Sequence, residues 1–484
     1  MTVRPADFPP PFDPEEFIAE PSDPPEERID VGALVVGAGP AGLSAAIRLA
    51  QLLEERPDMR ERLGEVPIAV VEKGSAPGAH LLSGAVVNPR AFRQLFPGMH
   101  TEDMPFRGPV VHEGLYYLTS KRALRLPAPP TMWNHGNHVA SLAEMGRWLA
   151  ERAEEFGVTI VPETAARKLL VAGGRVVGIR TGDRGRGRDG EELPNFEPGS
   201  DIRARVTILA EGTQGHLTGV AISRFALASK PQVWALGVKE VWEVPRPLER
   251  VIHTMGWPLR GGRKYREFGG SFIYPLGDSM VALGMVVGLD YADATLSVHD
   301  LLQELKGHPF VRRILEGGKR VAWGAKTIPE GGFLALPDRF HVPGAMIAGA
   351  AMNSLGKFPP RDLSLERDAD VPVFVGKRDR SYPQPDGKLF FDKLSSVFLS
   401  GNKTRDDAPS HIRIDRKVRR EVAETWVHLC PAQVYEVSAD ASPAGNVVGV
   451  EVTASNCIQC GAISAKGGRL TPPEGGDGPE YSLM

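Results

Sequence analysis

The sequence predicts an α/β protein, α+β overall, whose first domain is Rossmann-like. Four apolar residues at 33–36 lead into a glycine-rich turn at 37–42, and a helical pattern follows from Leu43 to Leu53. This order of strand, tight turn and helix is the context in which a G-x-G-x-x-G motif predicts dinucleotide binding. The 54 glycines and 42 prolines favour a loop-rich α/β protein over a helical bundle, and 484 residues accommodate two or three domains.

Each glycine of the turn has its own purpose in this motif. Gly37 permits the tight turn, Gly39 lets a pyrophosphate approach the backbone, and Gly42 lets the helix pack close to the strand. Pro40 and Ala41 mark the start of the helix, where free N–H groups and the positive end of the dipole attract phosphate. The alternative is a glycine-rich turn in an unrelated α/β domain.

A second predicted strand, Ile68–Val71, ends at Glu72, whose carboxylate can accept hydrogen bonds from a ribose. It comes later than the roughly 20-residue spacing usual for the motif. The charged insert Glu54–Gly64 explains this delay as a longer helix and loop.

The next segments alternate between loops and strands. Residues 78–85 are small and glycine-rich, which suits either a loop against a flat ring or a plain turn. Strands are expected near 158–161, 168–172 and 175–180, and a helix near 139–156, while the polar stretch 182–201 is expected to be a mobile loop. A buried strand at 206–209 leads to Glu211 and Gly212, where two-domain flavoproteins touch their dinucleotide, although any core strand can end this way.

A second domain is expected from antiparallel strands in residues 232–291. Its clearest hairpin joins 272–276 to 281–287 through a Gly-Asp turn. The apolar faces can line a pocket for a greasy substrate or form plain core. Helices are expected near 298–306 and 309–316, and a last strand, Ala345–Ala348, ends at Gly349.

The N-terminus and the overall composition exclude several classes of protein. Residues 1–27 are acidic and proline-rich, without the basic and apolar regions of a secretory signal, and are expected to form a flexible or loosely docked arm. No apolar run is long enough for a transmembrane helix. A formal net charge of −3 gives no indication of nucleic-acid binding.

The three cysteines lie together near the C-terminus, after a charged, proline-rich linker at 356–387. Cys430 precedes a proline, and Cys457 and Cys460 form a C-x-x-C motif. In a chain without a secretory signal, this pattern favours an iron–sulfur or zinc site over a disulfide, with redundant thiols as the alternative. His135 and His138 have no carboxylate or thiol nearby at ligand spacing, so loop and capping roles are favoured for them.

Many short motifs, in order and over nearly the whole chain, resemble the electron-transfer flavoprotein–ubiquinone oxidoreductase family. They are VGAGPAG at 36–42, VEKG at 71–74, GAHLLSGA at 78–85, NHGN at 134–137, AEG at 210–212, GWPL at 256–259, GGSF at 269–272, VVGLDY at 286–291, EGGKR at 316–320, PDG at 385–387, LSSV at 394–397, CPA at 430–432, NC at 456–457 and PEGG at 473–476.

This resemblance implies a Rossmann-like FAD-binding domain (28–230 plus 310–355), an inserted antiparallel-sheet quinone or substrate domain (231–309) and a C-terminal ferredoxin-like domain (388–484) with a 4Fe–4S cluster. It implies electron transfer from reduced electron-transfer flavoprotein to ubiquinone or menaquinone. The protein is then expected to be peripheral, on the cytoplasmic side of the inner membrane, with the turn at 126–133 or the hairpin at 272–289 against the lipid.

The resemblance also assigns residues to each centre. Those expected at FAD are Gly37, Gly39, Pro40, Ala41, Gly42, Glu72, Lys73, Gly78, His80, Ser83, Gly84, Glu211, Gly212 and Gly349. Gly269 and Gly270 would face the quinone, and Cys430, Cys457 and Cys460 would ligate the cluster. No side chain is expected to act as a nucleophile, because the cofactors carry the chemistry.

The chain departs from the family pattern at two places. Ile463 stands where the family has a further cysteine, so a cubane needs a non-cysteine fourth ligand or water, and a three-iron cluster or an empty site are the alternatives. After Asn353 the sequence passes directly to the linker, so a helix beside the flavin and much of the quinone-side helical region are expected to be missing. Competing interpretations are an FAD-dependent reductase of an isoprenoid-like substrate, such as a geranylgeranyl reductase, and a degenerate non-catalytic paralogue.

Overall fold

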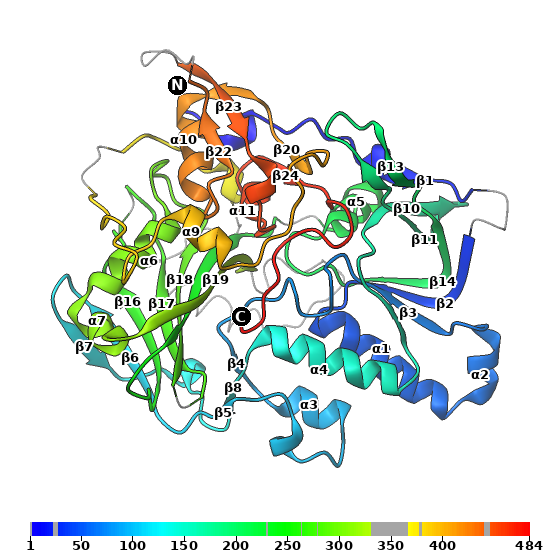
Figure 1. Cartoon of the computed structure of the whole chain (residues 1–484), viewed down its shortest axis with the longest axis horizontal. Helices are drawn as coiled ribbons and strands as arrows, with labels where there is room; N and C mark the ends of the chain where they lie inside the picture. The colour runs from blue at the N-terminus through cyan, green and yellow to red at the C-terminus, as the bar shows by residue number, and fades with distance from the viewer. Residues whose placement is uncertain are drawn as a thin grey trace.

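The computed structural model describes residues 2–22, 28–228, 231–262, 264–277, 279–330, 366–376, 380–439 and 446–484. Within them, two seven-stranded sheets stand side by side and the C-terminal domain lies across their upper end in Figure 1. The predicted strand at 345–348, Gly349 and the junction after Asn353 fall outside the described residues.

The first sheet has the strand order β1-β10-β11-β14-β2-β3-β9, and its β14, β2, β3 and β9 run parallel. The strands are β1 (Ile18–Ala19), β2 (Arg28–Val36), β3 (Ile68–Val71), β9 (Thr159–Val161), β10 (Ala166–Ala172), β11 (Arg175–Thr181) and β14 (Asp201–Leu209). This sheet confirms the predicted Rossmann-like α/β start of the chain.

Both faces of the parallel strands are covered, as their continuous apolar sequence requires. Val35 and Val70 pack with α1 (Pro40–Glu54) and α4 (Leu142–Glu155) in one core. The alternate residues Leu34 and Val71 pack on the other face with α5 (His216–Phe225). The two-residue period of a strand thus divides one apolar run between two cores.

Of the two expectations for the N-terminal arm, flexible or loosely docked, the described residues 2–22 show the docked one. Phe17 is buried in the same core as α5, and β1 adds a parallel strand beside β10. The apolar residues of the arm explain the docking, because burying a large aromatic side chain stabilises a docked segment. The expected mobile loop at 182–201 also forms structure, a two-stranded ribbon of β12 (Arg184–Arg186) and β13 (Glu192–Glu197).

The second sheet has the order β19-β15-β18-β17-β16-β6-β7. Its strands are β6 (Glu113–Leu118), β7 (Ala123–Leu126), β15 (Trp234–Glu243), β16 (Val251–Gly256), β17 (Gly269–Pro275), β18 (Met280–Gly288) and β19 (Lys319–Pro329). Three of these strands, β6, β7 and β19, come from outside the 231–309 range expected for this domain. The predicted hairpin of β17 and β18 is interior to the sheet, so it does not form a membrane surface.

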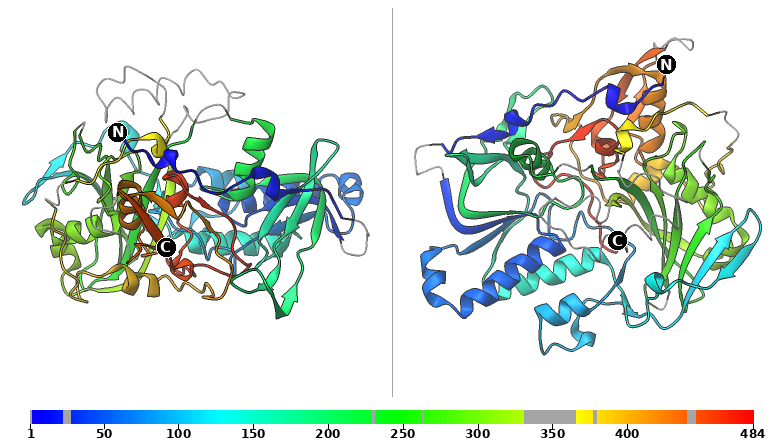
Figure 2. Two further views of the ribbon diagram at one scale, coloured as in Figure 1. Left: turned by 90° about the horizontal axis from the view of Figure 1, so that it is seen from above. Right: turned by 180° about the vertical axis from the view of Figure 1, so that it is seen from behind.

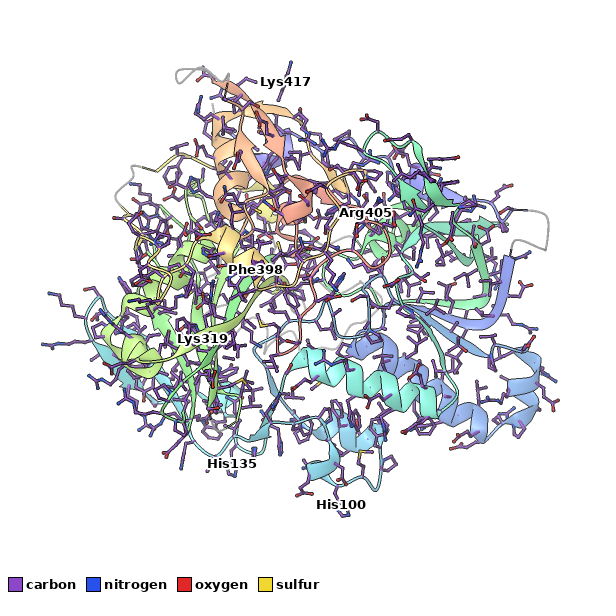
Figure 3. The ribbon with its side chains drawn as sticks, viewed as in Figure 1. His100, His135, Lys319, Phe398, Arg405 and Lys417 are labelled. Carbon is purple, nitrogen blue, oxygen red and sulfur yellow. The ribbon has the colours of Figure 1, made fainter. Side chains whose placement is uncertain are left out.

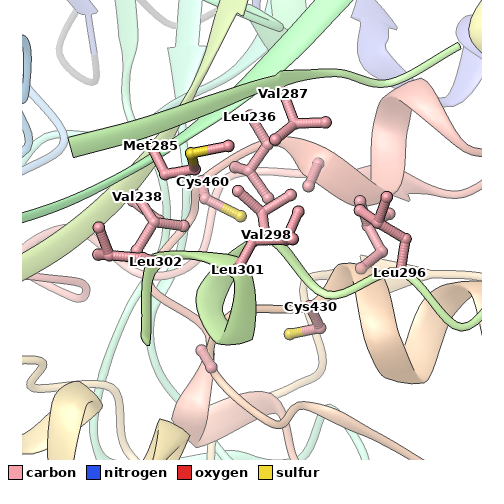
Figure 4. Close-up of a cluster of buried hydrophobic side chains, with 14 of the residues drawn as sticks. Leu236, Val238, Met285, Val287, Leu296, Val298, Leu301, Leu302, Cys430 and Cys460 are labelled. Atoms are coloured by element: carbon pink, nitrogen blue, oxygen red, sulfur yellow. The ribbon is translucent and has the colours of Figure 1, made fainter. Parts of the chain in front are cut away.

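Helices α6 (Val298–Gly307) and α7 (Pro309–Leu315) cover this sheet, and their leucines and valines join its buried side chains in the largest core (Figure 4). Shorter elements complete the two halves: α2 (Pro57–Arg62), α3 (Arg90–Leu95), β4 (Val86–Val87), β5 (Gly108–Pro109) and β8 (His138–Val139). The turns of 3-10 helix are η1 (Pro5–Asp7), η2 (Pro14–Phe17), η4 (Thr101–Asp103), η5 (Pro130–Met132), η7 (Asp368–Asp370) and η8 (Ala454–Asn456).

The C-terminal domain is a small α+β unit, orange to red in Figure 2. It contains α9 (Lys393–Phe398), β20 (Ile412–Arg413), β21 (Lys417–Arg419), α10 (Arg420–Leu429), β22 (Tyr435–Val437), β23 (Val447–Val452), α11 (Ala462–Ala465) and β24 (Arg469–Leu470). Its tail returns between the two sheets, where Tyr481 N–H donates to the Ala79 carbonyl and Ala143 N–H donates to the Met484 carbonyl. The tail therefore fixes the C-terminal domain against the first sheet and α4.

Candidate functional site

A cavity of about 400 Å³ opens at the carboxyl ends of the parallel strands, where ligands bind in open α/β sheets. Its lining comes from many segments, among them the glycine turn, the end of β3, the loop at 80–83, the turn after β14, the end of β19 and parts of the C-terminal domain. Its lining includes ten of the predicted residues: Gly37, Gly39, Pro40, Ala41, Glu72, Lys73, His80, Ser83, Glu211 and Gly212. The strand topology thus brings together groups that lie far apart in the sequence.

Two glycines of the turn have no room for a side chain, whereas the third faces open space. A Cβ on Gly37, which has φ +108°, would lie 2.5 Å from the Ala210 carbonyl oxygen, and one on Gly42 would lie 2.0 Å from the Gly37 carbonyl oxygen. A Cβ on Gly39 would meet nothing closer than the Leu81 side chain at 3.8 Å. Space over Gly39 and the start of α1 is therefore left for a ligand.

Two acidic residues at this edge are bound to backbone groups. Glu72 accepts hydrogen bonds from the N–H of Ala38 at 2.9 Å and of Gly74 at 2.8 Å, which holds the glycine turn against β3. Glu211 accepts from the N–H of Leu217 at 3.0 Å and of Thr218 at 2.6 Å. The Glu211 carboxylate therefore caps the N-terminus of α5.

The loop at 78–85 is held between α4 and the second sheet. Gly78 lies so close to α4 that a Cβ would be 2.4 Å from the Ala143 carbonyl oxygen, and Gly84 lies against Tyr274. Lys239 is buried and donates to the Ser83 carbonyl at 2.9 Å. Gly42, Gly78 and Gly84 do not line the cavity, and their contacts within the protein account for the glycines.

Two half-buried lysines, Lys73 and Lys326, line the cavity and both bind Gln459. Lys73 donates to the Gln459 side-chain oxygen, and Lys326 donates to its backbone carbonyl at 3.2 Å. Burial lowers the pKa of both ammonium groups, that of Lys326 to about 8. Gln459 immediately precedes Cys460 in the C-x-x-C motif, so these hydrogen bonds connect the cavity to the cysteine loop.

The three cysteines converge on a second pocket, although they come from two distant segments. Cys430 follows α10, Cys457 and Cys460 follow η8, and all three sulfurs are buried and unpaired by disulfides. Figure 4 shows Cys460 beside Met285 and Leu236 of the second sheet, and Cys430 belongs to the same buried cluster. Burial raises the pKa of each thiol, that of Cys460 to about 12.

Two of the three sulfurs accept hydrogen bonds from backbone N–H groups. Val434 N–H donates to the Cys430 sulfur and Gln459 N–H to the Cys457 sulfur, both at 3.4 Å, an arrangement that tunes iron–sulfur sites. Over the described ranges, no three His, Cys, Asp or Glu side chains are close enough to hold one metal ion. His135 is not among the residues that line this pocket, and it lies at the opposite end of the view from Lys417 of the C-terminal domain (Figure 3).

The two pockets share a wall. Gly461 and Leu470 line both the large cavity and the cysteine pocket. The cavity also contains polar atoms ready for a ligand, because His80 Nδ1 and Gln214 Nε2 are buried without a hydrogen-bond partner among the described residues. The donor sets therefore fit a polar dinucleotide in one pocket and a thiolate-held cluster in the other.

Gly269 and Gly270, expected at the quinone, lie outside both pockets. A Cβ on Gly269 would be 2.0 Å from the Val286 carbonyl oxygen, and one on Gly270 would be 2.4 Å from the Thr254 carbonyl oxygen. Close strand pairing in the second sheet thus accounts for both glycines without a ligand.

A nucleotide-type cavity at a parallel sheet edge, next to a pocket of three thiols, defines a redox protein with a dinucleotide and a metal centre. Comparison with known families agrees. The family model "ETF-QO, ubiquinone-binding" matches residues 234–328, and "Electron transfer flavoprotein-ubiquinone oxidoreductase, 4Fe-4S" matches 387–482. The chain belongs to the electron transfer flavoprotein–ubiquinone oxidoreductase family, as the relatives below show.

The mitochondrial electron transfer flavoprotein-ubiquinone oxidoreductase of Arabidopsis thaliana is 35% identical over 553 residues, covering 95% of this chain and 85% of the relative. The Pseudomonas aeruginosa protein of that name is 34% identical, covering 95% and 100%. A geranylgeranyl bacteriochlorophyll reductase-like structure from Thermoplasma acidophilum aligns at 16% identity with a TM-score of 0.47, over 63% of this chain and 67% of that one.

These comparisons confirm the predicted family, the oxidoreductase class and the cofactors FAD and a 4Fe–4S cluster. The 4Fe–4S domain argues against a flavin-only isoprenoid reductase. The alignment of 553 residues exceeds the 484 of this chain, so the chain carries deletions relative to the Arabidopsis protein.

Sequence reasoning missed several residues of the cavity, above all Lys326, Gln214 and His216. Lys326 lies in a strand with no motif around it, and only the fold of β19 brings it to the cysteine loop. Gln459 was visible as part of C-x-x-C, but nothing in the sequence indicated its bonds to two lysines.

Proposed function

We propose that this chain takes electrons from reduced electron-transfer flavoprotein and passes them through FAD and an iron–sulfur cluster to ubiquinone or menaquinone. The observation that carries this proposal is the wall of Gly461 and Leu470 between the two pockets. Cofactors held in these adjoining pockets would exchange electrons across the shared residues, with no moving part of the protein required. The FAD supplies two-electron and one-electron chemistry, and the cluster supplies one-electron transfer.

The chain's own residues hold and insulate these groups. In this proposal the backbone at Gly37, Gly39 and Ala41 and the start of α1 bind the pyrophosphate, and Glu72 and Lys73 hold the adenosine side. His80, Ser83 and Gly212 lie near the remainder of the flavin. Gly349 keeps its predicted place at FAD as an expectation, since it lies outside the described residues.

Cys430, Cys457 and Cys460 would ligate the cluster as thiolates. Burial disfavours the free thiolates here, so metal binding must supply the free energy that deprotonates them. Lys73 and Lys326, bound to Gln459 between the pockets, add positive charge that favours electrons on either side of the wall.

The surface of the second sheet offers a face for a quinone-bearing membrane. Leu124, Tyr117 and Met255 are cross-strand neighbours on β7, β6 and β16, and each is exposed, by 50%, 44% and 37% of its surface. Lys121 and Arg122 are exposed in the turn beside them. Apolar side chains next to basic ones suit the boundary of an anionic bilayer.

The described residues contain no helix of the length and hydropathy needed to cross a bilayer. On this proposal the chain is peripheral, on the cytoplasmic side of the inner membrane, and the quinone reaches Gly269 and Gly270 from that face.

The test is quinone reduction by protein purified without oxygen and loaded with FAD, iron and sulfide. Reduced electron-transfer flavoprotein is the donor, and ubiquinone and menaquinone analogues are compared as acceptors. Reduction that depends on the donor flavoprotein supports the proposal. Failure to retain FAD or any iron would instead support the degenerate, non-catalytic alternative.

A further inference from the structure

The cysteine pocket contains three sulfur ligands and a fourth position that is apolar. The whole chain has only three cysteines, and Cys430, Cys457 and Cys460 all line this pocket. Ile463 lines it too, and continues the three-residue spacing of Cys457 and Cys460. A 4Fe–4S cluster ordinarily takes four cysteine thiolates, so one of its four irons has no cysteine here.

The other lining residues offer no evident replacement. Among the described residues around the pocket, the side chains besides the thiols are hydrocarbon, with the exception of Tyr435. Within the part of the chain that the structure describes, no carboxylate or imidazole lines the pocket, although both are ordinary iron ligands.

Ile463 is also fixed in its place. Its side chain is buried and packs beneath Gly468, where an added Cβ would lie 2.5 Å from its Cγ1. The Ile463 carbonyl accepts from the N–H of Lys466 and Gly468, both at 3.0 Å. Closure of this turn keeps the hydrocarbon side chain at the fourth position.

We infer that the cluster is held by three protein thiolates, and that the iron nearest Ile463 takes a small exogenous ligand, water or hydroxide. This inference rests on the cluster of the proposed function but not on electron transfer to quinone. It makes one iron labile, since three protein ligands hold the other irons and none holds this one.

The chemical consequence is a defined one-electron step. When ferricyanide removes one electron from a [4Fe–4S]²⁺ cluster, loss of the labile iron as Fe²⁺ leaves [3Fe–4S]¹⁺, and ferrocyanide is the reduced product. Iron and charge balance, because removal of one electron raises the charge of the four-iron cluster from 2+ to 3+, which equals the sum of Fe²⁺ and [3Fe–4S]¹⁺. The three-iron product is paramagnetic and gives an EPR signal, which the starting cluster does not.

The experiment treats reconstituted wild-type protein and Ile463→Cys with one equivalent of ferricyanide and a chelator, and then counts iron and records EPR spectra. Wild type should fall from four irons to three per chain and gain the three-iron signal. Ile463→Cys should keep four irons and stay silent. Ile463→Ala, which removes the same side chain without adding a thiol, should behave as wild type.

Retention of four irons by the wild type would overturn the inference. If Tyr435→Phe lost the fourth iron while the wild type retained it, the Tyr435 phenol would be identified as the fourth ligand. Loss of iron by Ile463→Cys to the same extent as wild type would also overturn the inference. Absence of any iron–sulfur absorption in every variant would refute the cluster itself, and with it the proposed function.

Discussion

Replacing Gly39 with alanine tests where the pyrophosphate binds. The residue has φ −85° and ψ 176°, which any amino acid adopts, and its new methyl group would meet only Leu81, at 3.8 Å. The protein itself therefore tolerates the change, with a cost in unfolding free energy below about 0.5 kcal/mol. A phosphate held against this backbone would be displaced.

The size of the effect follows from the bonds at risk. A hydrogen bond to a charged group contributes about 1.5–3 kcal/mol, so loss of one bond weakens FAD binding about 10- to 150-fold. Flavin fluorescence titration of the apoprotein measures the affinity, and thermal unfolding of the same samples measures stability.

Gly42→Ala is the matched control within the same turn. Its methyl group would lie 2.0 Å from the Gly37 carbonyl oxygen, so it should destabilise the apoprotein by about 1–3 kcal/mol through overpacking. Unchanged FAD affinity in Gly39→Ala, with normal stability, would refute the placement of the pyrophosphate over Gly39.

Three further predictions concern stability and surface. Glu240→Gln leaves two buried cations uncompensated and should cost about 3–5 kcal/mol in denaturant unfolding, whereas Glu316→Gln in an exposed pair should cost less than about 1 kcal/mol. Burial, followed by repulsion from nearby arginines, lowers the pKa of His216 in the folded protein to about 3. The stability that the neutral ring contributes is therefore fully present above pH 6.5, which is about the pKa of histidine in the unfolded chain. As the pH falls from 6.5 toward 3, the free energy of unfolding should decrease by up to about 1.4 kcal/mol per pH unit. Urea titrations at several pH values measure this slope, and His216→Gln should make it smaller. An unchanged slope in His216→Gln would contradict the assignment. Leu124→Asp should lower cosedimentation with anionic vesicles, while Leu52→Asp, an exposed change on α1, should not; equal losses would rule out the proposed face.

The elements that the sequence predicted correctly are those that depend on residues close together in the chain. The strand, turn and helix at 33–54 and the acidic residue after β3 follow from apolar runs and glycines within a few residues of one another. The C-x-x-C motif likewise indicated a metal centre, and the resemblance to the family pattern identified Ile463 as the position of the missing cysteine.

The remainder depends on tertiary contacts that no local pattern encodes. Phe17 docks the arm because α5 presents an apolar face to it, and β6 joins the second sheet through its parallel pairing with β16. Glu211 lines the cavity, and nothing in the sequence indicated that its carboxylate also binds the first turn of α5. Lys326 reaches the cysteine loop only because β19 spans the second sheet.

The central claim is that the two pockets hold redox centres that act together. The most direct measurement mixes the reconstituted protein with reduced electron-transfer flavoprotein without oxygen, then follows flavin absorbance and the EPR signal of the frozen sample before and after a ubiquinone analogue is added. We expect flavin bleaching together with a reduced-cluster signal, and loss of both when quinone is added. A reduced flavin beside a cluster that never changes its spectrum would contradict the account.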